Sequence, residues 1–277
     1  MKRILTSAAL AAAALSAQAA GTTLANGDFA FTGVNVNTSV GGWSFVTFVD
    51  LAAGTTIYFT DTNVLQATPA AGVFSTTAEG FWSWTASSAV AAGTSVALRG
   101  SGTNNGQYTA KSGEAGGTAN GTVIALNGTN GTNISSGGDI LYAFQAASFA
   151  TNYQPSAITF LGAISNRAAY TTSDNAVAAT GLGGIQVRTF RGSGDTRYTQ
   201  FTAQTTTADT PYASMAELKL ALADGSNWTT IASSTSTPIV ADVLAVAAPV
   251  PEPETYALML AGIAVVGGVA RRRGLRR

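Results

Sequence analysis

Short runs in which apolar and polar residues alternate recur through the middle of the chain. Because successive side chains of a strand point to opposite faces, this alternation predicts β-strands with one buried face. Threonine is abundant in these runs and suits strands through its β-branch. The predicted strands cover 29–31, 45–49, 56–59, 81–84, 95–98, 123–126, 140–144, 158–161, 185–188 and a run beginning at 201. Many short strands without long helices predict an all-β fold, an antiparallel β-sandwich.

One segment, 210–223, has helical periodicity instead. Ser214 and Glu217 have the spacing of a capping box, and Gly225 lies where a C-terminal cap is expected. Met215, Leu218 and Leu222 form one apolar stripe, which predicts a single short helix docked on the sandwich.

A seven-residue pattern occurs twice. LAAGTTI at 51–57 returns as VAAGTSV at 90–96, so a small-residue turn with a glycine leads into a strand each time. The unit is too short to indicate a solenoid.

The predicted sandwich domain covers residues 20–234. Within it, 100–138 is rich in Gly, Asn and Thr, and we expect a flexible insertion there. Residues 235–249 read as a Ser/Thr/Ala/Val linker that lifts the domain off a membrane.

Several stretches of the domain are similar to secreted bacterial domains of the lamin-tail-like type. They are GDFAFTGVNVNTSVGGWSFVTFVDLAAGTTIYFTD, EGFWSW, VAAGTSVAL, GDILYAFQ, ITFLGAIS and LALADGSNWTT. The resemblance spans about 26–234. It implies an immunoglobulin-like β-sandwich and carries no catalytic residues with it.

The N-terminus has the layout of a secretory signal peptide. Lys2 and Arg3 precede an apolar stretch from Ile4 to Leu15, and Ala17-Gln18-Ala19 is a small-x-small cleavage site. We expect residues 1–19 to be a signal, with an uncleaved membrane helix as the alternative.

The C-terminus, VPEPETYALMLAGIAVVGGVARRRGLRR at 250–277, combines a proline hinge, an apolar run and a basic end. The run 255–270 predicts a transmembrane helix of about 24 Å, shorter than a hydrocarbon core of about 30 Å. Arg271, Arg272 and Arg273 would keep the end of the tail cytoplasmic. Signal and tail together place the body outside the inner membrane.

This tail resembles the PEP-CTERM sorting signal of Gram-negative bacteria. The match lies in Pro251-Glu252-Pro253, the Thr-Tyr-Ala-Leu-Met-Leu-Ala-Gly start, the apolar run and the arginine cluster. The resemblance implies an exosortase as partner, cleavage near Pro251, Glu252 and Pro253, and transient anchoring in the inner membrane. It also implies an exopolysaccharide-producing, biofilm-forming host. A plain single-pass anchor is the alternative.

The composition of the chain excludes or argues against several kinds of catalytic, metal-binding and nucleic-acid-binding site. The 277 residues include no Cys and no His, which excludes Ser-His-Asp and Cys-His catalysis and the usual zinc sites. Charged residues make up 10%, and between residues 21 and 250 seven basic side chains face twelve acidic ones. An acidic body argues against binding to nucleic acid. We expect no cofactor and no metal site.

Two tryptophans are the candidate ligand-binding residues. Trp82 and Trp84 are two apart, so a strand places them on one face, where indoles can stack on sugar rings. Core packing is the competing interpretation. A glycosidase would need two converging carboxylates from Asp61, Glu79, Glu114 and Asp139, and no motif selects a pair.

We therefore expect an exported, non-enzymatic protein of the cell envelope or extracellular matrix, with a structural or adhesive role in biofilm. A polysaccharide-binding module that uses Trp82 and Trp84 is the first alternative. A secreted hydrolase is the second.

Overall fold

The computed structural model describes the central body of the chain and short pieces beyond it. The described residues are 21–36, 41–64, 74, 80–100, 108–112, 119–126, 140–147, 149, 155–165, 177–189, 198–202, 212–231, 239, 241, 244, 246–247, 259 and 261–263.

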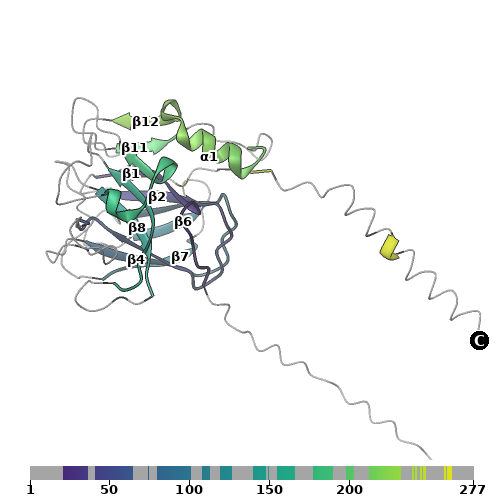
Figure 1. Cartoon of the computed structure of the whole chain (residues 1–277), viewed down its shortest axis with the longest axis horizontal. Coiled ribbons are helices and arrows are strands. Elements are labelled where there is room, and N and C mark those ends of the chain that lie inside the picture. Colours follow the sequence, from purple (N-terminus) through teal and green to yellow (C-terminus); the bar gives the residue numbers. More distant parts are fainter. Residues whose placement is uncertain are drawn as a thin grey trace, which may run out of the picture.

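Two six-stranded sheets form the body, stacked as two layers (Figure 1). The first sheet has the order β12-β11-β1-β2-β5-β6. Its strands are β1 (Phe29–Asn35), β2 (Gly42–Thr47), β5 (Ser95–Gly100), β6 (Tyr108–Ser112), β11 (Tyr198–Phe201) and β12 (Trp228–Ile231). All of its strand pairs are antiparallel.

The second sheet has the order β10-β9-β8-β3-β4-β7. Its strands are β3 (Thr56–Thr60), β4 (Phe81–Ala86), β7 (Gly121–Ala125), β8 (Ile140–Gln145), β9 (Thr159–Ser165) and β10 (Val187–Thr189). Only β9 and β10 pair in parallel; the other pairs of this sheet are antiparallel. The predicted all-β, mainly antiparallel two-sheet architecture is confirmed.

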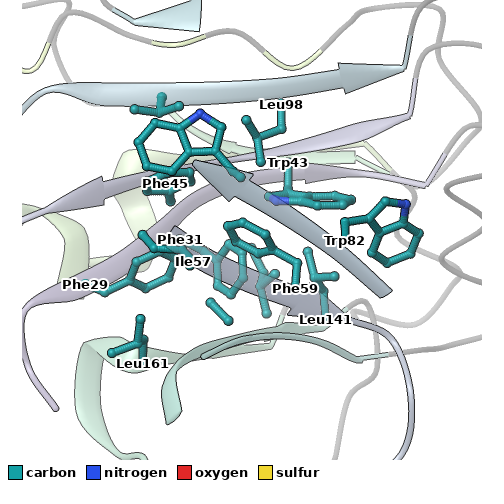
Figure 2. Packing of buried hydrophobic residues seen from close by; sticks show 14 of the residues in the cluster. Phe29, Phe31, Trp43, Phe45, Ile57, Phe59, Trp82, Leu98, Leu141 and Leu161 are labelled. Carbon is teal, nitrogen blue, oxygen red and sulfur yellow. The ribbon is translucent and has the colours of Figure 1, made fainter. Parts of the chain in front are cut away.

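The core between the sheets consists of every second residue of the central strands (Figure 2). Phe29 of β1 stacks on Phe45 of β2 at 5.2 Å and meets Phe31 of its own strand edge-on at 5.0 Å. Across the layer, Phe59 of β3 lies 5.7 Å from Phe45, centroid to centroid. On β1 to β4 the rings of this cluster share the inward face of their strand, whereas β8 turns Leu141 and Ala143 inward.

The outer faces of both sheets are also largely covered. On the second sheet, Tyr142, Phe144 and Phe160 pack against Val64 and Phe74 from a segment outside the sheets. On the first sheet, Val46 and Phe48 pack against the helix, and Ala97 and Tyr198 pack against the chain near its C-terminal end.

The predicted helix is α1 (Met215–Ala223). Ser214 caps it by accepting a hydrogen bond from the Glu217 backbone N–H, and the Glu217 carboxylate accepts one from the Ala213 backbone N–H at 2.6 Å. The Ser214 half of the predicted capping box is therefore present, and the Glu217 carboxylate bonds the residue before the cap instead of the cap itself. The prediction that Gly225 caps the C-terminal end of the helix is wrong. Asp224 ends it, and Gly225 begins the 3-10 helix η3 (Gly225–Asn227).

Two strands lie in the segment expected to be a flexible insertion, 100–138. β6 extends the edge of the first sheet by pairing with β5, and β7 extends the second by pairing with β4. β7 overlaps the strand predicted at 123–126, whereas β6 was not predicted, because backbone pairing at a sheet edge needs little side-chain hydrophobicity. A second difference is at 185–188, where the chain forms the 3-10 helix η2 (Gly184–Gln186) before β10. A further 3-10 helix, η1 (Val177–Thr180), precedes it.

The predicted signal, residues 1–19, lies outside the described residues. Of the predicted transmembrane run 255–270, Met259 and residues 261–263 are described, and they are helical. Among the residues that the structure describes, no helix is long and apolar enough to cross a membrane.

Candidate functional site

The two candidate tryptophans do not face solvent. Trp82 and Trp84 are each 0% exposed. Trp82 meets Trp43 edge-on at 5.2 Å, and Trp84 meets Phe45 at 5.3 Å. A Cβ added at Gly80 or at Gly121 would overlap the ring of Trp82 or of Trp84, respectively. Both indoles are therefore enclosed core residues, and the sugar-stacking platform that the polysaccharide alternative required is not present at these positions.

The residues of the sorting tail lie beyond the described part of the chain. This applies to Pro251, Glu252 and Pro253 and to Arg271, Arg272 and Arg273. The structure instead describes how the body is built where the two ends of the chain meet it.

The repeated seven-residue pattern forms two equivalent turns that bond to each other. Leu51 and Val90 exchange two backbone hydrogen bonds of 2.8 and 2.9 Å. The first turn, 51–54, leads from the first sheet to the second, and the second turn, 90–93, leads back. We call the end of the sandwich that carries both turns the turn end. The echo in the sequence is thus a paired crossover between the sheets.

The N-terminal segment of the body docks on the first of these turns. Thr22 Oγ1 donates to the Asp50 carbonyl and accepts from the Ala52 N–H at 2.9 Å. A Cβ at Gly21 would lie 2.7 Å from Thr55 Cα and 2.8 Å from the Gly54 carbonyl oxygen. The chain therefore passes against the turn where only glycine fits.

Gln145, at the end of β8, fastens the same segment from the other side. Its Oε1 accepts from the Leu24 N–H at 2.7 Å, and its Nε2 donates to the carbonyls of Thr22 and Thr56, each at 3.0 Å. One side chain thus satisfies three backbone groups that a neighbouring strand would otherwise pair.

We call the three hydrogen bonds of Gln145 the Gln145 clamp. A shallow pocket of about 380 Å³ opens beside it. Its wall includes Thr22, Thr56, Tyr58, Gln145 and Thr159, and every lining residue is uncharged. Tyr58 is held between the rings of Phe144 and Phe149, stacked at 5.5 and 5.3 Å. The pocket offers neutral polar groups and one fixed aromatic side chain.

The C-terminal segment of the body docks on the second turn and on the outer face of the first sheet. Among its described residues, Ile239 and Ala241 are 0% exposed and Leu244 is 5% exposed. Val246 forms a parallel bridge with Tyr212, and the Ala247 N–H donates to the Tyr212 carbonyl at 2.8 Å. We call the described residues of this segment the strap: Ile239, Ala241, Leu244, Val246 and Ala247. The prediction of a linker that lifts the body away does not fit these buried positions.

The helix joins the same end of the sandwich. Lys219 of α1 places its ammonium group 4.4 Å from the centre of the Phe48 ring and donates to the Gly27 carbonyl at 3.1 Å. This cation–π contact and hydrogen bond tie the helix to the turn before β1.

Three titratable side chains have shifted pKa values. Hydrogen bonds from the Ser226 backbone and hydroxyl groups lower the pKa of Asp224, and Arg188 lowers it further. Burial lowers the pKa of Arg188, whose guanidinium lies 5.3 Å from the Trp228 ring centre. Burial also lowers the pKa of Arg99. Asp224 and Arg188 interact with each other, and the shift at Arg99 has burial as its cause.

Of the four candidate hydrolytic carboxylates, Asp61 lies among the described residues. Asp61 is 3% exposed, and its Oδ1 accepts from the Gly80 N–H at 2.6 Å; Glu79, Glu114 and Asp139 lie outside the described residues. Within the described ranges, no three acidic residues gather where they could hold a metal ion.

Sequence reasoning missed the Gln145 clamp and the strap. A glutamine at a strand end gives no signal of its own. The strap did leave one, because PIVADVLAV at 238–246 is more apolar than a solvated linker needs to be.

Comparison with protein families gives one match: residues 249–277 fit the PEP-CTERM protein-sorting motif. The motif indicates an exported protein that is sorted at the cell envelope by an exosortase. No curated protein and no solved structure matches the chain. The lamin-tail resemblance of the body therefore receives no support.

Proposed function

We propose that this chain is an exported, non-enzymatic β-sandwich protein that an exosortase processes near Pro251-Glu252-Pro253. The observation that carries the proposal is the match of residues 249–277 to the sorting motif. In this account the apolar run 255–270 holds the precursor in the inner membrane transiently, and the arginines after it stay on the cytoplasmic side. Cleavage then passes the body to the envelope or the extracellular matrix.

The proposed role of the mature body is structural or adhesive. Its support is the packing of the described residues, in which the largest aromatic rings are enclosed. A dense, cysteine-free sandwich is suited to persist outside the cell without disulfides. The immunoglobulin-like topology implied by the lamin-tail resemblance is not part of the proposal.

Exopolysaccharide is the proposed partner in the matrix. With the tryptophans enclosed, the neutral pocket lined by Thr22, Tyr58 and Thr159 is the described recess whose chemistry suits an uncharged polyhydroxylated ligand. Thr159 is exposed at its rim. Changing Thr159→Arg places a long charged side chain there. We expect it to weaken retention of the mature protein on the host polysaccharide, and unchanged retention would exclude this pocket.

The processing step is tested in a host that has an exosortase. Replacing Pro251, Glu252 and Pro253 with alanine should leave the full-length chain in the inner-membrane fraction, whereas the unmodified chain should appear as a shortened form outside. The readout is an immunoblot of cell fractions with antibody against the body.

Pro238→Ala is the matched control, because it removes a nearby proline outside the motif. It should be processed like the unmodified chain. Normal shortening of the triple-alanine variant would sink the proposal.

A further inference from the structure

We infer that the strap fixes the orientation of the precursor, so that the turn end of the sandwich faces the membrane while the sorting tail is inserted. This inference rests on the proposed function, because it takes the tail to be a membrane anchor. It adds a defined membrane-facing surface of the body, held there by the strap.

The strap is seated as part of the fold. The side chain of Ile239 reaches the middle of β1, where the position of a Cβ on Gly33 would be 3.2 Å from its Cδ1 atom. Farther on, Val246 lies at Gly93 of the second turn, with its Cγ2 atom 3.2 Å from the corresponding position. The strap therefore follows the first sheet and leaves the body at the turn end.

We call the chain between the docked part of the body and the apolar run 255–270 the tether. Docking of the strap shortens it. Seven residues lie between Ala247 and Thr255, where the apolar run begins, and the eight Cα-to-Cα steps reach at most about 27 Å when fully extended. With the strap released, the free chain would start after Ile231, and its 24 residues would reach about 80 Å. A body on the short tether has to keep its point of exit near the bilayer.

Both chain ends leave the body at this same end. Gly21 packs against Gly54 and Thr55 of the first turn, and the strap ends at Gly93 of the second. The two turns are joined by the Leu51 and Val90 bridge and by the Ala92 N–H, which donates to Asp50 Oδ1 at 2.8 Å. A predicted signal still attached to the precursor would thus be directed to the same surface as the tail.

The charge of the turn end indicates that this surface does not bind lipid itself and that the tether keeps it near the membrane. Asp28, Asp50 and Glu217 lie around this end, together with Lys219. A net negative surface is repelled by anionic lipid headgroups. Cleavage of the tail therefore frees the body from the membrane.

The absence of cysteine allows a direct test by single-site labelling. Ala53→Cys and Ala91→Cys place a fluorophore on exposed positions of the two turns. Asn63→Cys places it beyond the opposite end of β3, on a partly exposed position. Each full chain is reconstituted into phosphatidylethanolamine–phosphatidylglycerol vesicles that carry a quencher on the lipid headgroup.

Flotation with the vesicles first measures insertion, and quenching then measures orientation. We expect labels at positions 53 and 91 to be quenched several-fold more strongly than the label at position 63. Leu244→Asp should release the strap and bring the three labels to similar quenching. Leu220→Asp makes the same chemical change at a 72% exposed position of α1 and should preserve the difference.

A second variant guards against misfolding of Leu244→Asp. Inserting sixteen Gly/Ser residues after Ala247 lengthens the tether and leaves the strap untouched, and it should abolish the difference in quenching as well. Equal quenching of all three labels in an inserted, unmodified chain overturns the inference and leaves the proposed function standing. Failure of the chain to float with the vesicles removes the anchor itself, and the proposed function with it.

Discussion

Gly54 and Gly93 occupy equivalent positions in the two paired turns, with φ angles of +84° and +83°. Each backbone N–H donates a 2.8 Å hydrogen bond to the last residue of a strand in the sheet that the chain is entering. Gly54 donates to the Ala86 carbonyl of β4, and Gly93 donates to the Thr47 carbonyl of β2. The two positions differ in one respect. The space around Gly54 is open, whereas Gly93 lies under Met215 and Val246.

This difference predicts unequal effects of the same substitution. Gly54→Ala should lower the free energy of unfolding by about 1–2 kcal/mol, the cost of the left-handed conformation for an L-residue. Gly93→Ala should cost about 1 kcal/mol more, because its methyl group would press on Met215 of α1, at 3.0 Å, and on Val246 of the strap, at 3.2 Å. Denaturant unfolding of the full chain in mild detergent measures both.

The strap contribution can be isolated with a double variant. Gly93→Ala combined with Val246→Ala should lose less than the sum of the two single changes, because the crowding is relieved. Equal destabilisation by Gly54→Ala and Gly93→Ala would mean that Val246 is not seated at the turn.

The Gln145 clamp predicts local release of the N-terminal segment. Gln145→Leu keeps a similar volume but leaves the Leu24 N–H and the Thr22 and Thr56 carbonyls without this partner. We expect a loss of about 1–3 kcal/mol and faster amide hydrogen exchange at residues 22–24. Thr23→Ala, at an exposed position of the same segment, is the control. Unchanged exchange in Gln145→Leu would rule out the clamp.

Because the tryptophans are enclosed, we expect their fluorescence emission to stay unchanged when polysaccharide is added. Trp43, Trp82 and Trp84 are each 0% exposed, so iodide should quench their emission poorly in the folded protein. Titration with the host polysaccharide should not shift a Trp82-dependent signal. Trp82→Ala should lower the free energy of unfolding by about 3–5 kcal/mol because it empties the core between the sheets. A sugar-dependent shift that disappears in Trp82→Phe would restore the platform.

The lowered pKa of Asp224 predicts an acid-dependent part of stability. A carboxylate whose pKa is lower in the folded state stabilises the fold above its unfolded pKa, and this contribution is lost as the pH falls through the folded pKa. The charged form accepts from Ser226. Asp224→Asn should therefore lower the melting temperature at neutral pH and differ less from the unmodified chain in strong acid. A difference that does not depend on pH would contradict this assignment.

Prediction of the central strands succeeded because their signal is local. Phe29, Phe45, Phe59 and Trp84 each belong to a short run rich in aromatic and β-branched residues, which favours a strand whatever the rest of the chain does. The helix was predicted for the same reason, since Ser214 and Glu217 lie within one turn of each other and make their bonds without help from distant residues.

The edge strand β6 and the strap could not be derived in this way. β6 is a strand because β5 offers it unpaired backbone groups, and that partner is defined only after the sheet exists. The strap is buried because Gly33 leaves room for Ile239 on the outer face of the first sheet. Nothing next to Ile239 in the sequence specifies that space.

The sequence by itself determined the sorting motif at 249–277 and the alternation that makes two sheets, because both depend on neighbouring residues. Only the tertiary structure decided that Trp82 and Trp84 face the interior, that the repeated turns join, and that both chain ends leave at one end of the body. Those outcomes depend on contacts between residues far apart in the chain, such as Leu51 with Val90 and Gln145 with Thr22.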